Sequence, residues 1–201
     1  MIENMIVGGG FAFAAAVQPG PLQAFLLSRV AAVGWKRTLP AALAPIISDG
    51  PIAILMLVLL HNLARGFESF LRGAGGIVLL YFATRAFNEW RSASRGTISE
   101  RPSAPRTLLH AVAVNIVNPG PYLGWSLILG PLVLQEWADK PQNAVALIVS
   151  FYVVMVLCLA TFILIVGTTT YLGSRGRRFL LLASSFALAG LGVYSLMAAF
   201  R

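Results

Sequence analysis

One acidic residue, Asp49, lies in the middle of a long apolar stretch of this 201-residue chain, and no other Asp, Glu, Lys or Arg occurs between Thr38 and Ala64. An ionised carboxylate at the centre of a bilayer costs at least about 2.5–3.5 kcal/mol on insertion scales, which favours the neutral, protonated form. A carboxyl group that gains and loses a proton suits proton coupling in transport. The alternative is a neutral Asp49 that bonds Ser48 or a freed backbone carbonyl and serves packing alone.

Two Pro-Gly-Pro motifs interrupt further apolar stretches, one hundred residues apart. A proline removes the helical hydrogen bond to the carbonyl four residues earlier, and a glycine lets the backbone turn sharply. Each motif therefore predicts a broken helix, with free carbonyls before the break and the positive end of a helix dipole after it. Free carbonyls suit an ammonium group, and a half-helix N-terminus suits a carboxylate. The motifs are Gln18-Pro19-Gly20-Pro21 and Asn118-Pro119-Gly120-Pro121.

Amide side chains accompany both breaks. Gln18 and Asn118 occupy matching positions. Gln23 lies just inside the second half-helix of the first motif, and Asn115 lies one turn before the second motif. These amides either bind a substrate or repair the interrupted backbone. Because they occur at two symmetric breaks, we predict a substrate site made of Gln18, Pro19, Gly20, Pro21, Gln23, Asn115, Asn118, Pro119, Gly120 and Pro121, with Asp49 as the proton-coupling residue.

Other chemistries lack the residues that they need. Cys158 is the single cysteine, so one chain offers no disulfide, redox pair or cysteine metal site. His61 and His110 fall near opposite membrane faces and cannot ligate one metal together. A membrane redox or hydrolytic enzyme would need paired cysteines, metal ligands or an acid pair, and all are missing. We therefore expect no enzyme, no metal and no cofactor.

Composition places these residues in a membrane. The chain is 58% hydrophobic, its mean hydropathy is +0.80 and only 11% of its residues are charged, whereas soluble domains carry about 25%. The net charge of +8 comes from Lys and Arg at the ends of the apolar stretches, which the positive-inside bias explains without a nucleic-acid partner.

Apolar stretches long enough for a bilayer predict six spans. The third is the weakest, because Arg72 and Arg85 bracket only twelve uncharged residues, and whether it crosses fully is left open. Eleven of the 15 Lys and Arg residues fall on one side, which predicts that both termini are periplasmic. The acidic start argues for a retained first span instead of a cleaved signal peptide. The spans are expected at about 4–33, 38–62, 68–90, 107–135, 141–171 and 178–200.

A polar, basic segment, residues 91–106, is expected to be a cytoplasmic linker between two halves, residues 1–90 and 107–201. Three spans per half make equivalent helices run in opposite directions, an arrangement that recurs in secondary transporters. The expected fold is an all-α membrane protein of six transmembrane helices in two inverted-topology three-helix repeats, the first helix of each half being broken. The two Pro-Gly-Pro motifs lie one hundred residues apart, so the position in the second half that corresponds to Asp49 falls at Val149 and Ser150. Neither residue is acidic, so only the first half carries an acid at this position.

The stretch PGPLQAFLLSRVAAVGWKRTLPAALAPIISDGPI resembles the N-terminal signature of the lysine-exporter (LysE/RhtB) family of amino-acid translocators. The later NIVNPGPYLGW resembles the second Asn-Pro element of that family, and LAGLGVYSLMA resembles its last span. The resemblance covers nearly the whole chain. One departure is that the second motif, NPGP, is closer to the first motif than to the plainer Asn-Pro pattern usual in the family.

The resemblance implies export of small amino acids or related metabolites from the bacterial cytoplasm, through the inner membrane and in exchange for protons. The resemblance implies that the following residues match motif elements of the family: Pro19-Gly20-Pro21, Asp49 and Asn118-Pro119. The alternative is a passive channel or membrane assembly subunit without proton coupling. The expected partners are a small zwitterionic substrate, the proton and the lipid bilayer; the cargo, the coupling stoichiometry and homo-oligomerisation stay open.

Overall fold

The computed structural model describes residues 1–18, 20–59, 65–95, 103–169 and 173–199, and every regular element in these ranges is a helix. The expected all-α class is confirmed for this part of the chain. The elements are α1 (Ile2–Val17), α2 (Pro21–Val33), α3 (Trp35–Thr38), the 3-10 helix η1 (Leu39–Leu43), α4 (Ala44–Leu59), α5 (Arg65–Arg95), α6 (Ala104–Ile116), α7 (Pro119–Gly124), the π-helical turn η2 (Trp125–Leu129), α8 (Gly130–Asp139), α9 (Pro141–Thr169) and α10 (Gly173–Ala199).

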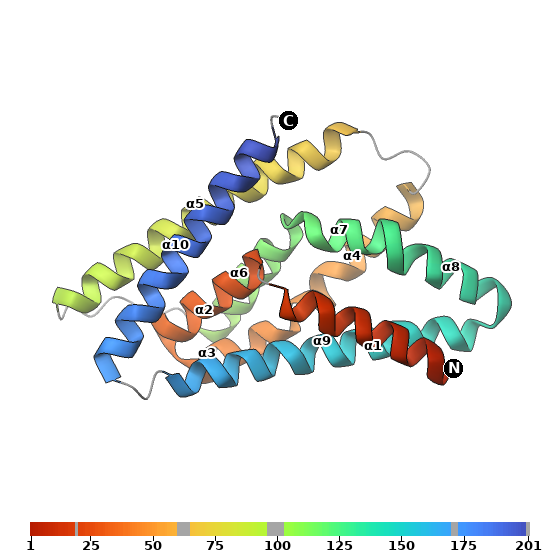
Figure 1. Ribbon diagram of the computed structural model, residues 1–201, viewed down its shortest axis with the longest axis horizontal. Helices are drawn as coiled ribbons and strands as arrows, with labels where there is room; N and C mark the ends of the chain where they lie inside the picture. The colour runs from red at the N-terminus through yellow and green to blue at the C-terminus, as the bar shows by residue number, and fades with distance from the viewer. Residues whose placement is uncertain (19, 60–64, 96–102, 170–172, 200–201) are drawn as a thin grey trace.

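Consecutive elements form helical segments that alternate in direction along the chain (Figure 1). Helices α5 and α10 pack along each other and run antiparallel, whereas α1 runs parallel to α9. Helix α4 packs against α6, and α2 contacts α5, α6, α9 and α10. Helix α2 is therefore the central element, which explains why most of its residues are buried.

Three helices among the described residues are long and apolar enough to cross a membrane: 35–56, 141–168 and 178–197. The pair α1–α2, bent by 61° at the first Pro-Gly-Pro motif, makes a fourth if it forms one span. Helix α5 is not among these three, and α6–α8 is divided into short pieces. The chain is a multi-pass membrane protein, and the full set of six spans remains a prediction.

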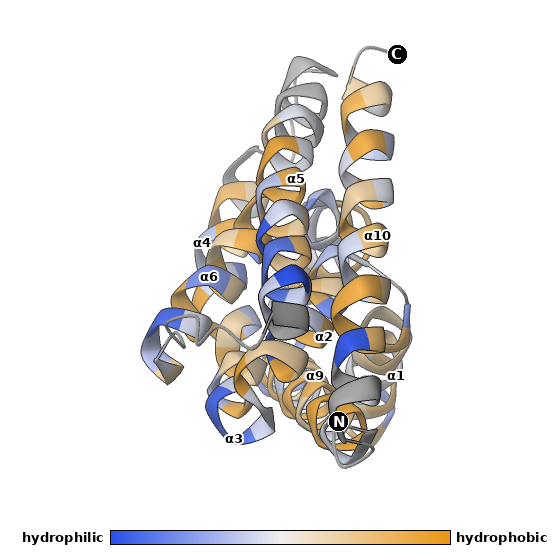
Figure 2. Cartoon of the chain, turned by 90° about the vertical axis from the view of Figure 1, so that its left-hand side faces the viewer, coloured by the Kyte–Doolittle hydropathy of each residue, from blue (hydrophilic) through white to orange (hydrophobic). Residues whose placement is uncertain are grey.

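Helix α9 has the composition expected of a lipid-facing helix, because most of its residues are apolar. Hydrophobic residues also predominate on most of the other helices seen in Figure 2. One face of α9 is buried in the protein and the other is exposed. The exposed face consists of Val145, Val149, Val153 and Leu157, and the buried face includes Leu147, Phe151, Met155, Leu159 and Ile163. Its outer face therefore suits hydrocarbon.

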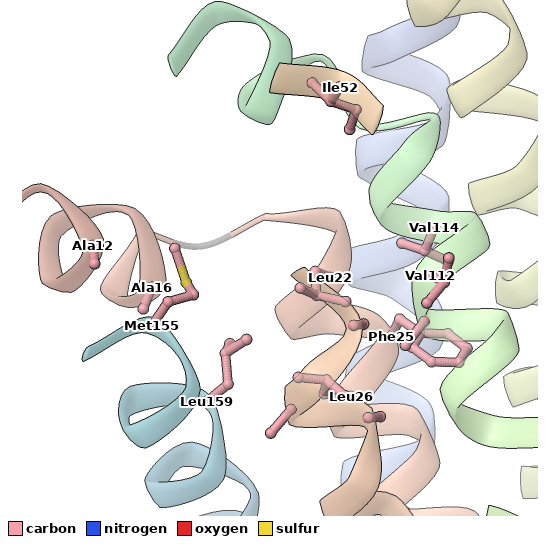
Figure 3. Close-up of a cluster of buried hydrophobic side chains, with 14 of the residues drawn as sticks. Ala12, Ala16, Leu22, Phe25, Leu26, Ile52, Val112, Val114, Met155 and Leu159 are labelled. Atoms are coloured by element: carbon pink, nitrogen blue, oxygen red, sulfur yellow. The ribbon is translucent and has the colours of Figure 1, made fainter. Parts of the chain in front are cut away.

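The core lies around α2. Leu22, Phe25 and Leu26 are at most 5% exposed, and they meet apolar side chains of α6 and α9 near the first break (Figure 3). The Phe25 ring packs edge-on against Phe82 of α5, with 4.7 Å between ring centroids. This packing fixes the half-helix that follows the first break.

The expected linker, 91–106, is helical at both ends. Helix α5 continues to Arg95 and α6 begins at Ala104, whereas residues 96–102 lie outside the described residues. The sequence pattern did not reveal this continuation of α5. The division into halves at 1–90 and 107–201 remains a prediction. His61, considered above as a metal ligand, also lies outside the described residues.

Close approach of α5 and α10 depends on Gly76. A Cβ atom there would lie 2.6 Å from Cγ of Leu196 and 2.8 Å from the carbonyl oxygen of Gly192, so the two helices would have to separate. We expect Gly76→Ala to lower the free energy of unfolding in detergent by about 1–3 kcal/mol, the usual cost of overpacking.

The matched control for this prediction is Gly190→Ala. It has the same chemistry in a helix interior, and nothing lies within 4 Å of the added Cβ. This control is expected to be neutral or to gain about 0.5–1 kcal/mol from lost backbone freedom in the unfolded chain. Thermal unfolding of both variants is the measurement, and equal stability of the two would contradict the packing described here.

Candidate functional site

The first Pro-Gly-Pro motif separates α1 from α2, as the sequence predicts. Helix α1 ends at Val17, Gln18 is extended, and α2 begins at Pro21 without a side-chain cap. Pro19 lies outside the described residues. The Gln23 side-chain amide donates to the carbonyl of Ala16 at 3.0 Å and contacts that of Ala15 at 3.5 Å. Gln23 therefore repairs the carbonyls left open at the end of α1, the second of the two roles considered for these amides.

The second motif separates α6 from α7 in the same way. Helix α6 ends at Ile116, and Asn118 caps α7 by accepting a hydrogen bond from the Gly120 N–H at 3.1 Å. The Tyr122 hydroxyl donates to the Ile116 carbonyl at 2.7 Å. Helix α5 packs closely against this break at Gly75. A Cβ atom added to this glycine would lie 2.5 Å from the carbonyl oxygen of Val117. The break is thus stabilised by its own side chains and by a neighbouring helix.

Asp49 lies on α4, two residues before Pro51, and is only 3% exposed. Its Oδ1 accepts a hydrogen bond from Nδ2 of Asn115 at 2.7 Å and lies 3.3 Å from the Ser48 hydroxyl. The Asn115 amide also donates to the Ser48 oxygen at 2.6 Å, while that hydroxyl donates to the Ala44 carbonyl at 2.9 Å. Asp49 is therefore joined to the residue one turn before the second break.

A cavity of about 460 Å³ lies between the two breaks and Asp49. It brings together most of the predicted substrate site, although those residues are a hundred positions apart in the chain. Pro119 is not among the lining residues, and Pro19 is not described. The predicted residues that line the cavity are Gln18, Gly20, Pro21, Gln23, Asn115, Asn118, Gly120 and Pro121, together with Asp49.

Sequence reasoning missed the apolar walls of this cavity. Phe11 of α1, Trp125 of η2 and Phe151 of α9 all line it, as does Met155 of α9. The rings of Phe11 and Phe151 stack with 6.1 Å between centroids, and Trp125 packs edge-on to Phe151 at 6.3 Å. Trp125 opens a π-helical turn, a distortion that recurs at functional sites and gave no signal in the apolar sequence.

Asp49 is the only ionisable side chain among the described residues that line the cavity. No group of three or more His, Cys, Asp or Glu that could hold a metal occurs in the described part of the chain. His110 packs instead against Phe82, with 5.5 Å between ring centroids. The site thus combines one carboxyl group, several amides and two interrupted backbones.

Comparison with known families identifies the chain. A family model described as "LysE type translocator" matches residues 13–199, a range that includes both breaks, Asp49 and every residue that lines the cavity except Phe11. Comparison with curated proteins and with solved structures gave no significant match. The family resemblance that the sequence motifs indicate is confirmed, and members of this family are membrane transporters, not enzymes. The chain therefore belongs to the LysE type translocator family.

Proposed function

We propose that the protein is a secondary active exporter of amino acids or related small metabolites, driven by exchange for protons across a bacterial inner membrane. Family membership supports transport. The observation that carries proton exchange is the position of Asp49. It is a buried carboxyl group at a cavity between two broken helices, and it bonds an amide beside the opposite break.

The two ends of a zwitterion have complementary places in the cavity. Helix α2 begins at the cavity without a side-chain cap, so the N–H groups of its first turn and its dipole favour a carboxylate. The Asp49 carboxylate favours an ammonium group. Gly20 and Asp49 both line the same space. A free amino acid meets both requirements with its backbone groups alone.

Competition for Asp49 explains how export is coupled to protons. An ionised Asp49 binds the substrate ammonium group, whereas a protonated Asp49 does not. Proton uptake from the outer side therefore releases the substrate outward. Proton release to the cytoplasm restores the charge, and the next substrate can bind. One carboxyl group carries either a proton or a substrate, so the two move in opposite directions.

The cavity supports alternating access because it lies on one side of the first break. Phe11 and Ala14 of α1 line it, as does Gln18 just after that helix, whereas α2 contributes only its first turn. Beyond that turn, Phe25 and Leu26 are fully buried. With periplasmic termini, as the charge distribution predicts, the α1 side of the cavity faces the periplasm and α2 closes the cytoplasmic side.

Helix pairing supports an inverted repeat. If the halves correspond, α1 matches α6, α4 matches α9, and α5 matches α10. A two-fold axis in the membrane would then turn the α1–α9 pair into the α6–α4 pair, and both pairs occur. The same axis would pair α5 with α10 in antiparallel orientation, which is how they lie (Figure 1).

Flux measurements in proteoliposomes test this function. Vesicles loaded with a mixture of amino acids are expected to exchange them against an imposed pH gradient, and collapse of the gradient with a protonophore is expected to stop the net flux. Flux that is unchanged after the collapse would favour the alternative, a passive channel. Absence of any substrate flux would favour an assembly subunit.

A further inference from the structure

We infer that the substrate is an amino acid with a large, uncharged, apolar side chain, either aliphatic, thioether or aromatic. This inference rests on the proposed function and deepens it. The side chain packs against an aromatic wall, defined as Phe11, Trp125 and Phe151, while the amino acid backbone occupies the polar end of the cavity at the two breaks.

The lining of the cavity is divided by polarity. Its amides and its carboxyl group come from the breaks and from α4. The aromatic wall comes from α1, η2 and α9, and its rings contact one another through Phe151. Met155 and Leu159 continue this apolar surface along α9 next to the first break (Figure 3). A bound zwitterion at the breaks would therefore direct its side chain toward apolar groups.

Charge excludes basic and acidic substrates. Asp49 is the only ionisable group among the described lining residues, and the substrate ammonium group or the proton occupies it. A lysine or arginine side chain would need a second carboxylate, and a glutamate side chain would need a cation. Burial of a charge without a partner is strongly unfavourable. The cavity therefore selects a neutral side chain.

Size favours a large side chain over a small one. The volume of about 460 Å³ falls in the lower half of the range of roughly 300–1,000 Å³ typical of small-molecule sites, so it suits a single amino acid. A methyl side chain would leave the aromatic wall uncovered. One methylene group in an apolar pocket changes selectivity by roughly 10–200-fold, so leucine is expected to exceed alanine by at least about tenfold.

Counterflow measures this preference. Proteoliposomes take up labelled leucine against an internal pool of unlabelled leucine, methionine, phenylalanine, alanine, lysine or glutamate. Strong exchange is expected with the first three pools, at least about tenfold weaker exchange with alanine, and background exchange with lysine and glutamate. The label and the membrane potential are the same in all vesicles, so only the side chain differs.

A pair of variants tests the wall itself. Phe11→Ala is expected to raise the KM for leucine and methionine by about tenfold or more, and to raise it less for phenylalanine, whose larger ring fills the added space. Phe13→Ala is the matched control, because Phe13 lies on the same helix and is 58% exposed on its outer face. The control is expected to leave all three KM values unchanged. If Phe11→Ala fails to fold, Met155→Val makes the same comparison.

The outcomes separate this inference from the proposed function. Lysine or glutamate exchanged as fast as leucine, in a manner that still depends on Asp49, would overturn the apolar substrate and leave proton-coupled export standing. A Phe11→Ala variant that changes every KM by the same factor would also overturn it. If no amino acid moves, the proposed function fails and this inference fails with it.

Discussion

Replacement of Asp49 by asparagine is expected to reduce pH-gradient-driven export to the level of protein-free vesicles. The substitution keeps the size of the side chain and a group that can bond Asn115, but it removes the exchangeable proton. It also removes the charge that binds the substrate ammonium group. A hydrogen bond to a charged group contributes about 1.5–3 kcal/mol, so substrate affinity is expected to fall by about 10- to 150-fold.

Asp139→Asn is the matched control for this experiment. It makes the same chemical change at an exposed position at the end of α8 and is expected to leave export unchanged. Asp49→Glu, which retains a titratable group, is expected to recover part of the proton dependence. Retention of full gradient-driven export by Asp49→Asn would show that Asp49 does not couple protons.

The second large effect is expected from the ion pair between α2 and α5. Nη2 of Arg29 lies 2.8 Å from Oε1 of Glu89, and the Arg29 side chain is only 2% exposed. Its guanidinium carbon also lies 5.8 Å from the centre of the Phe25 ring. Removal of one partner leaves an uncompensated buried charge, which costs about 3–5 kcal/mol. Arg29→Met alone should therefore lower the unfolding temperature in detergent by about 6–20 °C.

A double-mutant cycle separates the ion pair from packing. Arg29→Met and Glu89→Met together remove both charges, and the double variant is expected to recover most of the stability that Arg29→Met loses. Arg37→Met, at an exposed position on α3, is the control and is expected to change the unfolding temperature little. If the two single losses simply add in the double variant, the ion pair does not link α2 to α5.

Backbone chemistry explains why both breaks could be predicted from the sequence. Proline and glycine act on the chain locally, so the ends of α1 and α6 follow from the motifs without knowledge of the fold. Asp49 could also be predicted as a functional residue from the sequence, because a lone acid in an apolar stretch is rare. Its bond to Asn115 could not be predicted, because it depends on how α4 packs against α6.

The aromatic wall could not be predicted from the sequence for a different reason. Lipid, protein core and an apolar cavity all favour the same residue types, so hydropathy cannot distinguish Phe151, which lines the cavity, from Val153, which is exposed on the outer face of α9. The sequence position of Arg29 is also an incomplete guide to its environment. Arg29 lies near the end of an expected span, which predicts a cytoplasmic residue of the positive-inside pattern, but in the structure it is buried in α2 and pairs with Glu89.

Thiol labelling of the two breaks tests most directly whether they share one water-accessible substrate site. Cys158 is the only cysteine, so Cys158→Ser gives a thiol-free background for Gln18→Cys, Asn118→Cys and, on the outer face of α9, Val153→Cys. A charged, membrane-impermeant thiol reagent is expected to label both break positions and not the α9 position, and the transported amino acid is expected to protect both. Labelling of only one break, or labelling that substrate protects at neither, would contradict a shared site.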